Sequence, residues 1–216
     1  MLINAGDAMK TVAAALLLST TLCAAPRLFY SKYFKGSVPE YVAITVQQDG
    51  QVTYQEAKED DNPIKIQLDR ASVKEMFALT EKLDRFQHPL ESGLKIANLG
   101  QKTFRFDDGA EHHEIQFNYS EDVAAQALLD RFERITETEQ HFANLDRTAH
   151  FEKLGVNEVL LQLEITWDRN RLVAPEQFLP LLDRIAKNES YLHISRELAA
   201  SIAEAIRKPP PAEKSQ

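Results

Sequence analysis

Apolar and polar residues alternate between residues 41 and 68, which is the pattern of half-buried β-strands. Asp49-Gly50 separates two alternating runs, and this dipeptide predicts a β-hairpin with a type I′ turn. A third strand is expected at 64–68, after the break at Asn62-Pro63. Successive side chains of a strand point to opposite faces, so the alternating residues give the hairpin one apolar face. These residues are Val42, Ile44, Val46, Val52 and Tyr54.

The spacing of apolar residues lengthens after residue 71 to about 3.6, the period of an α-helix. Ser72 is expected to be the N-cap of this helix, because Glu75 completes a capping box. His88-Pro89 is expected to end it, since proline interrupts helical hydrogen bonding. A second hairpin is predicted around Asp108-Gly109.

A hairpin followed by a helix therefore occurs twice between residues 40 and 154. The second helix is expected to begin at Ser120 and to stop at Gly155. Both predicted helices contain Leu-Asp-Arg-Phe, at 83–86 and at 129–132. The recurrence suggests an internal ββα repeat. Chance is the alternative, because Leu and Phe facing a core and Asp and Arg facing water suit any amphipathic helix.

The C-terminal third is predicted to be helical. Residues 159–167 fit both a strand and a helix, and their leucine content and helical neighbours favour the helix. A further helix is expected with Pro175 in its first turn, and Ser190 is expected to cap the last one. The apolar face predicted for the last helix consists of Ile194, Leu198, Ile202 and Ile206.

The predicted fold class is α+β. An antiparallel sheet built from two Asp-Gly hairpins is covered by helices and is followed by a helical C-terminal region. The expected divisions of the chain are a signal peptide (1–25), an α+β domain (26–154), a helical region (155–207) and a disordered Pro-rich tail (208–216).

The first 25 residues have the three parts of a secretory signal peptide. Met9-Lys10 precedes an apolar run at 12–18, and small residues then lead to Pro26. The run is shorter than the roughly 20 apolar residues of a membrane-spanning helix. We therefore expect export to the periplasm or the exterior and no transmembrane span in the mature form. Met1 and Met9 are both candidate start positions.

Cys23 is the only cysteine, and it lies within the predicted signal peptide. Leu22 stands where a lipoprotein signal has a small residue, so ordinary cleavage near Ala24 or Ala25 is favoured over lipidation. The mature chain then has no cysteine, which excludes disulfides, a cysteine nucleophile and Cys-based zinc sites. Its stability is expected to come from its hydrophobic core.

The formal net charge is −8, and removal of residues 1–25 leaves it unchanged because Asp7 and Lys10 leave together. A general electrostatic attraction to nucleic acid is therefore not expected. The chain has seven glycines and no Gly-rich phosphate loop, so a nucleotide is not expected and no cofactor is predicted.

The segment 111–114, Glu-His-His-Glu, raises the question of a metal site. On a strand His112 and His113 point to opposite faces, so they cannot bind one metal ion together. We predict a solvated hairpin edge and no metal site. Glu137 and His141 are spaced i, i+4 on a helix, which is typical of an exposed helix surface. No catalytic residue is assigned.

Two groups of residues are candidates for binding. Phe29, Tyr30 and Tyr33 belong to an aromatic and basic segment, which is either a ligand-facing patch or a strand packed on the sheet. Trp167 and Arg169 combine an aromatic ring with a cation, which suits an anion or a peptide. A solvated helix end is the alternative for this second pair.

The stretch PEYVAITVQQDGQVTYQ at 39–55 resembles the entry hairpin of exported bacterial domains of unknown function. The chain differs from that group in lacking a mature cysteine before the proline. The resemblance carries no catalytic residue, and therefore no function. The matching residues are Pro39, Tyr41, Asp49, Gly50, Val52 and Tyr54.

The expected function is that of a noncatalytic interaction module that binds a protein or another envelope component. One alternative is a hydrolase whose carboxylates and histidine meet only in the fold. Another is a structural partner in an envelope assembly. A cleft that joins His113 or His141 to two carboxylates would favour the enzyme, whereas an exposed apolar groove near Phe29 would favour binding.

Overall fold

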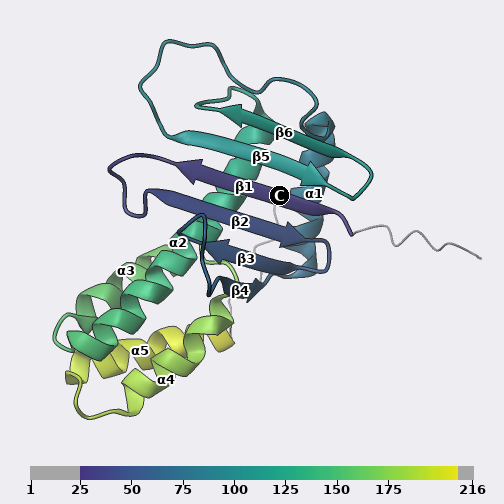
Figure 1. The fold of residues 1–216 in the computed structure, drawn as a ribbon. Helices are drawn as coiled ribbons and strands as arrows, with labels where there is room; N and C mark the ends of the chain where they lie inside the picture. Colours follow the sequence, from purple (N-terminus) through teal and green to yellow (C-terminus); the bar gives the residue numbers. More distant parts are fainter. Residues whose placement is uncertain (1–24, 209–216) are drawn as a thin grey trace, which may run out of the picture.

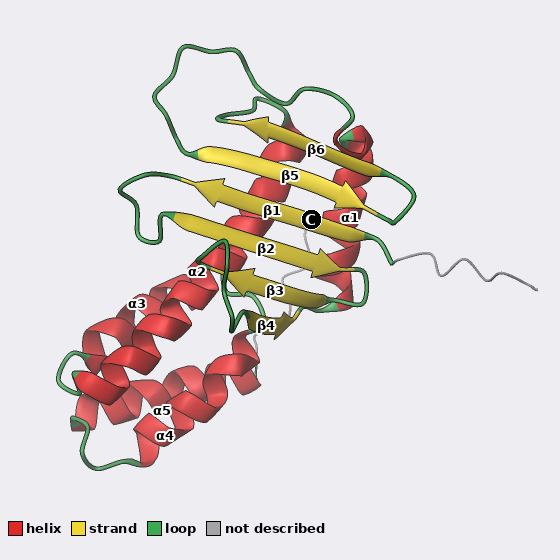
Figure 2. Ribbon diagram, viewed as in Figure 1, coloured by secondary structure: helices red, strands yellow, loops and turns green. Residues whose placement is uncertain are grey.

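The computed structural model describes residues 25–208 and has the predicted α+β fold. Six antiparallel strands form one sheet, and helices lie behind only one of its faces (Figure 1). A helical region projects away from the sheet (Figure 2). In chain order the elements are β1 (Arg27–Tyr33), β2 (Tyr41–Gln47), β3 (Gln51–Gln55), β4 (Ile64–Gln67), α1 (Arg70–Lys82), η1 (Asp84–Phe86), β5 (Gln101–Asp107), β6 (His112–Phe117), α2 (Val123–Phe151), α3 (Val156–Asp168), η2 (Pro175–Phe178), α4 (Leu179–Lys187) and α5 (His193–Arg207).

The spatial order of the strands is β4-β3-β2-β1-β5-β6. The aromatic segment at 27–33 is therefore a strand, and it lies at the centre of the sheet. Tyr30 pairs with Ile44 on one side and with Phe104 on the other. Because both neighbours of β1 are present, its backbone groups are used within the sheet.

Both Asp-Gly hairpins are present, but the first turn is not of type I′. Gly50 has a φ of 91°, whereas Asp49 is not in the left-handed region. The N–H of Gly50 donates to the carbonyl of Gln47 at 3.0 Å, as in a type I turn followed by a left-handed glycine. A Cβ on Gly50 would lie 2.7 Å from the carbonyl oxygen of Leu68, so the position requires glycine.

The covered face of the sheet forms a first hydrophobic core with α1 and α2. The ring of Tyr30 stacks on Phe132 of α2 with 4.8 Å between centroids, and Phe104 lies 5.8 Å from the same ring. Full burial of one such side chain contributes about 1.5–3 kcal/mol. These rings therefore hold α2 against the middle of the sheet.

The helix α1 begins and ends earlier than the sequence predicted. Its N-cap is Asp69, whose Oδ1 accepts hydrogen bonds from the N–H groups of Ala71 at 2.8 Å and Ser72 at 3.0 Å. Ser72 consequently lies inside the helix. The helix ends at Lys82, ahead of His88-Pro89, and its C-cap is followed by η1.

The two Leu-Asp-Arg-Phe segments have different conformations. In the first, Asp84, Arg85 and Phe86 have φ angles of 49°, 49° and 67°, and the chain leaves the helical path. The second lies inside α2. The tetrapeptide thus does not mark equivalent positions of a repeat.

The helix α2 joins two hydrophobic cores. Its N-cap is Asp122 rather than Ser120, because the Asp122 carboxylate accepts from the N–H groups of two residues in the first turn. Ile135 belongs to the first core and Leu145 to the second. The change from one core to the other therefore occurs within α2.

The helical region packs α3, η2, α4 and α5 around the last turns of α2. Residues 159–167 lie in α3, so the helical interpretation is confirmed. The last helix begins at His193 with Leu192 as N-cap, and Ser190 instead accepts a hydrogen bond from Lys153. Ile194 is 59% exposed, so it does not belong to the buried face of α5.

Two predicted segments fall largely outside the described residues. The predicted signal peptide covers 1–25, of which only Ala25 is described, and the predicted tail covers 208–216, of which only Lys208 is described. No described helix combines the length and the apolar character that a membrane crossing requires.

Candidate binding surface

Among residues 25–208 no helix lies over the second face of the sheet, which is turned toward the viewer in Figure 1. Strand register places side chains from neighbouring strands next to one another across this open face. One row consists of Lys65, Thr53, Thr45, Phe29, Arg105 and Glu114, and the next consists of Gln55, Ala43, Ser31, Thr103 and Gln116.

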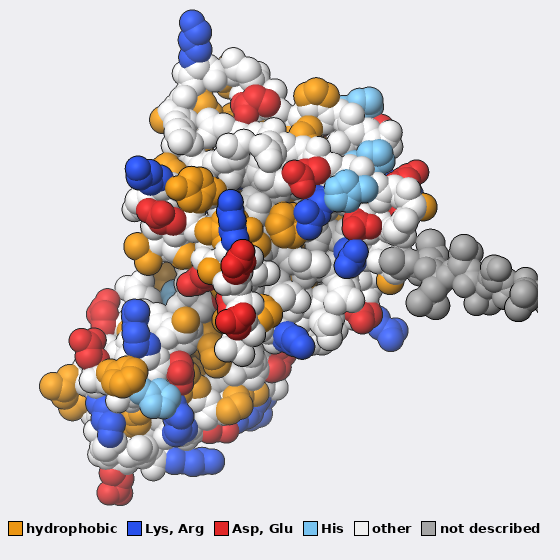
Figure 3. Space-filling view, viewed as in Figure 1, with side chains coloured by type: hydrophobic (Ala, Val, Ile, Leu, Met, Phe, Trp, Pro, Cys, Tyr) orange, Lys and Arg blue, Asp and Glu red, His pale blue; other side chains and the backbone are white. Residues whose placement is uncertain are grey.

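Aromatic and charged groups are paired at the centre of the open face. The guanidinium carbon of Arg105 lies 4.0 Å from the centroid of the Phe29 ring, a cation–π contact. Arg105 also forms an ion pair with Glu114 at 3.5 Å. Burial raises the pKa of Tyr41 further above its ordinary value of 10. The centre therefore presents rings and hydrogen-bonding groups, and hydrophobic side chains are interspersed with charged ones over this face (Figure 3).

The structure separates the three aromatic residues predicted to bind. Phe29 and Tyr33 lie on the open face, and Tyr33 is 50% exposed. Tyr30 points to the other face and is 1% exposed, so it belongs to the core and is not available to a ligand. Burial raises the pKa of Tyr30, consistent with a neutral core hydroxyl. The physical reason is the alternation of side chains along β1.

Trp167 and Arg169 lie at the end of α3, in the helical region. Trp167 is half-buried and packs against the second core, and Arg169 is exposed. Both residues lie in the helical region and not on the sheet, so the structure does not join them to Phe29 and Tyr33. The side chains that accompany those two were missed by the sequence analysis. They are Tyr41, Gln101, Arg105 and Gln116.

His112 and His113 diverge as the strand pattern predicted. His112 is exposed on the open side, and its Nδ1 lies 3.9 Å from an Asp107 carboxylate oxygen. His113 is half-buried on the other side. Within residues 25–208, no group of three or more His, Cys, Asp or Glu side chains is arranged to hold a metal ion.

A cleft of about 530 Å³ brings His141 together with Glu56 and Glu137. The Nε2 of His141 is 2.9 Å from the hydroxyl oxygen of Thr166, and burial lowers the pKa of His141. Glu137 accepts a hydrogen bond from Arg171 at 2.6 Å. Glu56 accepts one from the Tyr54 hydroxyl at 2.7 Å. All three groups thus already have structural partners.

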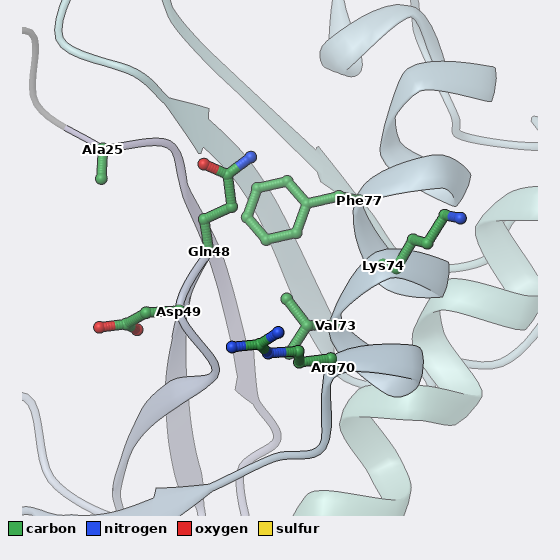
Figure 4. A pocket seen from close by; sticks show the side chains of 7 residues that line it. All are labelled: Ala25, Gln48, Asp49, Arg70, Val73, Lys74 and Phe77. Atoms are coloured by element: carbon green, nitrogen blue, oxygen red, sulfur yellow. The ribbon is translucent and has the colours of Figure 1, made fainter.

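A further cavity, about 670 Å³, lies between the first hairpin turn and α1. Figure 4 shows Phe77 and Gln48 facing one another, while the Lys74 side chain extends away from them. Val73 supplies apolar wall, and the Arg70 side chain extends toward the hairpin turn (Figure 4). Within residues 25–208 neither Arg70 nor Lys74 forms an ion pair.

A comparison with protein-family models and a comparison with curated proteins each found no match to the chain.

Proposed function

We propose that the protein is an exported, noncatalytic binding module and that the open sheet face contacts its partner in the cell envelope. One observation carries the proposal. The helices cover a single face of the sheet, and the other face holds Phe29, Tyr33 and Arg105 at or near the surface. Antiparallel sheets tolerate water on one face, and aromatic and Arg side chains are enriched where partners bind.

In the described part of the chain, no helix packs on the open face, so its side chains belong to neither hydrophobic core. Phe29 is not part of either hydrophobic core, although an aromatic side chain gains more from burial than almost any other. Its ring contacts the guanidinium of Arg105, and arginine recurs at binding hot spots. This pair is therefore available to a partner.

The experiment is site-specific photo-cross-linking in intact cells. A photoreactive amino acid at Thr45, in the middle of the open face, is compared with one at Ala78, an exposed residue of α1. We expect a cross-linked product from Thr45 and none from Ala78. Equal yields from both positions, or none from Thr45, would contradict the proposal.

Export is tested separately by fractionation and N-terminal sequencing. The expected mature protein begins near Pro26 and is recovered outside the cytoplasm. Recovery from the cytoplasm with Met1 or Met9 at its N-terminus would refute the export part. The binding surface would remain testable in that case, because it depends only on the sheet.

The cleft beside His141 favours a second candidate function, that of a hydrolase. A neutral imidazole near two carboxylates is able to take up a proton from a bound water. Replacement of His141 by Asn distinguishes the two functions. If the protein is a hydrolase, this variant loses turnover of its substrate. If it is a binding module, the variant still gives the cross-linked product from Thr45.

A further inference from the structure

A polar hollow of about 390 Å³ lies where the open face meets the irregular segment 87–100. It is lined by side chains of the strands and of this segment, and one of them is aromatic. A long segment without regular structure is uncommon in a compact protein unless it is functional or disordered. The main lining side chains are Tyr33, Lys35, Glu91, Asn98, Gln101 and Gln116.

The segment is fixed to the sheet by specific polar contacts. Asn118 accepts from the N–H of Leu99 at 2.7 Å and donates to the carbonyl of Ala97 at 3.1 Å. Lys102 is buried, and its Nζ donates to three backbone carbonyls, those of Leu99, Gly100 and Asn118 at 3.3, 3.1 and 2.7 Å. The wall is consequently formed before any ligand arrives, which lowers the entropic cost of binding.

The amide side chains in the hollow retain unused hydrogen-bonding atoms. Gln101 Nε2 donates to Gln116 Oε1 at 2.9 Å, so Gln101 Oε1 and Gln116 Nε2 remain for a ligand. Asn98 Oδ1 accepts from Gly100, which leaves the Asn98 amide nitrogen. Glu91 accepts from the Asn118 N–H through Oε2, which leaves Oε1. Donors and acceptors are therefore present in similar measure.

Tyr33 adds a ring to this set of polar atoms. It is 50% exposed, and its hydroxyl has no hydrogen-bond partner within residues 25–208. A ring with one polar end suits a ligand with an apolar face and a polar rim. A pyranose sugar has this form, because its C–H groups lie on its faces and its hydroxyls lie around its edge, each able to donate and to accept.

We propose that the hollow beside Tyr33 is a saccharide-binding site, with one sugar ring against Tyr33 and its hydroxyls on Gln101, Gln116 and Asn98. This inference rests on the proposed binding function and names the ligand class for that end of the open face. The lining includes one cationic side chain, Lys35, and one anionic side chain, Glu91, so its formal charge is zero, which suits a neutral sugar.

The test measures binding of neutral oligosaccharides to the purified mature protein by calorimetry and by saturation-transfer NMR. The probes are trimers of glucose, galactose and N-acetylglucosamine. We expect at least one trimer to bind, and Tyr33→Ala and Gln116→Ala each to weaken that binding about tenfold. Tyr33→Phe keeps the ring and is expected to lose only about threefold. The matched control is Gln55→Ala, an amide on the same face but on β3, which is expected to bind like wild type.

Two results would overturn the inference. One is that none of the three trimers binds with a Kd below about 5 mM, a limit set by the few contacts that one subsite offers. The other is that Tyr33→Ala and Gln55→Ala bind a trimer equally well. If a protein is cross-linked from Thr45 while no sugar binds, the saccharide inference fails and the proposed binding function stands.

Discussion

Glu139 gives a sharp prediction about stability, because its carboxylate is buried between the two cores. It is 1% exposed, and Gln177 donates to Oε1 at 3.0 Å, while Oε2 has no hydrogen-bond partner in the part of the chain described. Burial raises the pKa of Glu139 from its ordinary value of 4.5 to about 6, and the Gln177 hydrogen bond offsets part of that rise.

The sign of the effect follows from the two pKa values. Between pH 4.5 and 6 the folded protein binds more protons at Glu139 than the unfolded chain does, so stability falls as the pH rises. Above about pH 6 Glu139 is ionised in the folded state, and the full loss of stability from its buried charge is present. A difference of about 1.5 pKa units corresponds to about 2 kcal/mol of unfolding free energy.

The perturbation is Glu139→Gln, which keeps an acceptor for Gln177 and removes the charge. At pH 8 this variant is expected to be about 2 kcal/mol more stable than wild type, and near pH 4 the two are expected to be about equal. Urea unfolding followed by circular dichroism at pH 4, 6 and 8 measures the difference. Glu189→Gln, at an exposed residue before α5, is the control and is expected to change little at any pH.

The reasoning is refuted if the stability difference between Glu139→Gln and wild type is the same at pH 4 and pH 8. It is also refuted if the variant is less stable at pH 8. Either result would mean that the charged carboxylate is well solvated or has a favourable partner in the native state.

Three further predictions concern the contacts that hold the fold together. Gly50→Ala is expected to destabilise the protein by about 1–3 kcal/mol in urea unfolding, because of its positive φ and the Leu68 carbonyl, and unchanged stability would contradict this. Lys102→Met removes two hydrogen bonds to carbonyls of the segment 87–100 and one to the carbonyl of Asn118. Limited proteolysis is therefore expected to cut within 94–99 faster than in wild type, whereas an unaltered cleavage rate would argue against this anchor. Arg171→Leu breaks ion pairs with Asp130 and Glu137 and is expected to lower the unfolding free energy by about 1–3 kcal/mol. The control is Lys208→Ala, which breaks an exposed ion pair and is expected to change the stability very little; thermal unfolding measures both.

Strand periodicity made the sheet predictable from the sequence. The alternation around Asp49-Gly50 and Asp108-Gly109 located both hairpins, because a half-buried strand must place apolar residues on one side. The same rule separates Phe29 from Tyr30, since adjacent strand residues face opposite ways. Once residues 27–33 are assigned to a strand, the sequence pattern predicts that Tyr30 lies on the opposite face from Phe29.

Helix ends were less predictable because several residues near each end are able to cap. Ser72 and Ser120 both have the right chemistry, yet Asp69 and Asp122 accept the N–H groups. A carboxylate favours the positive end of the helix dipole as well as the hydrogen bonds. Where each helix meets the sheet then decides which candidate lies at its end, and that contact is not visible in local sequence.

The contacts that shape the candidate site lie too far apart in sequence for pattern reasoning. The row that contains Phe29 and Arg105 depends on β5 lying beside β1, although five elements separate these strands in the chain. The polar hollow depends on Asn118 holding Leu99. Neither strand order nor side-chain contact between distant segments follows from periodicity.

The most direct measurement compares the reactivity of single cysteines, since the predicted mature chain contains none. Thr45→Cys and Ala78→Cys are treated with a membrane-permeable maleimide in intact cells and as purified protein. The account predicts that Cys at 45 reacts more slowly in cells than in the purified protein, because a partner covers the open face, while Cys at 78 reacts at the same rate in both. Equal rates for the residue 45 variant in the two settings would contradict the claim that this face is occupied.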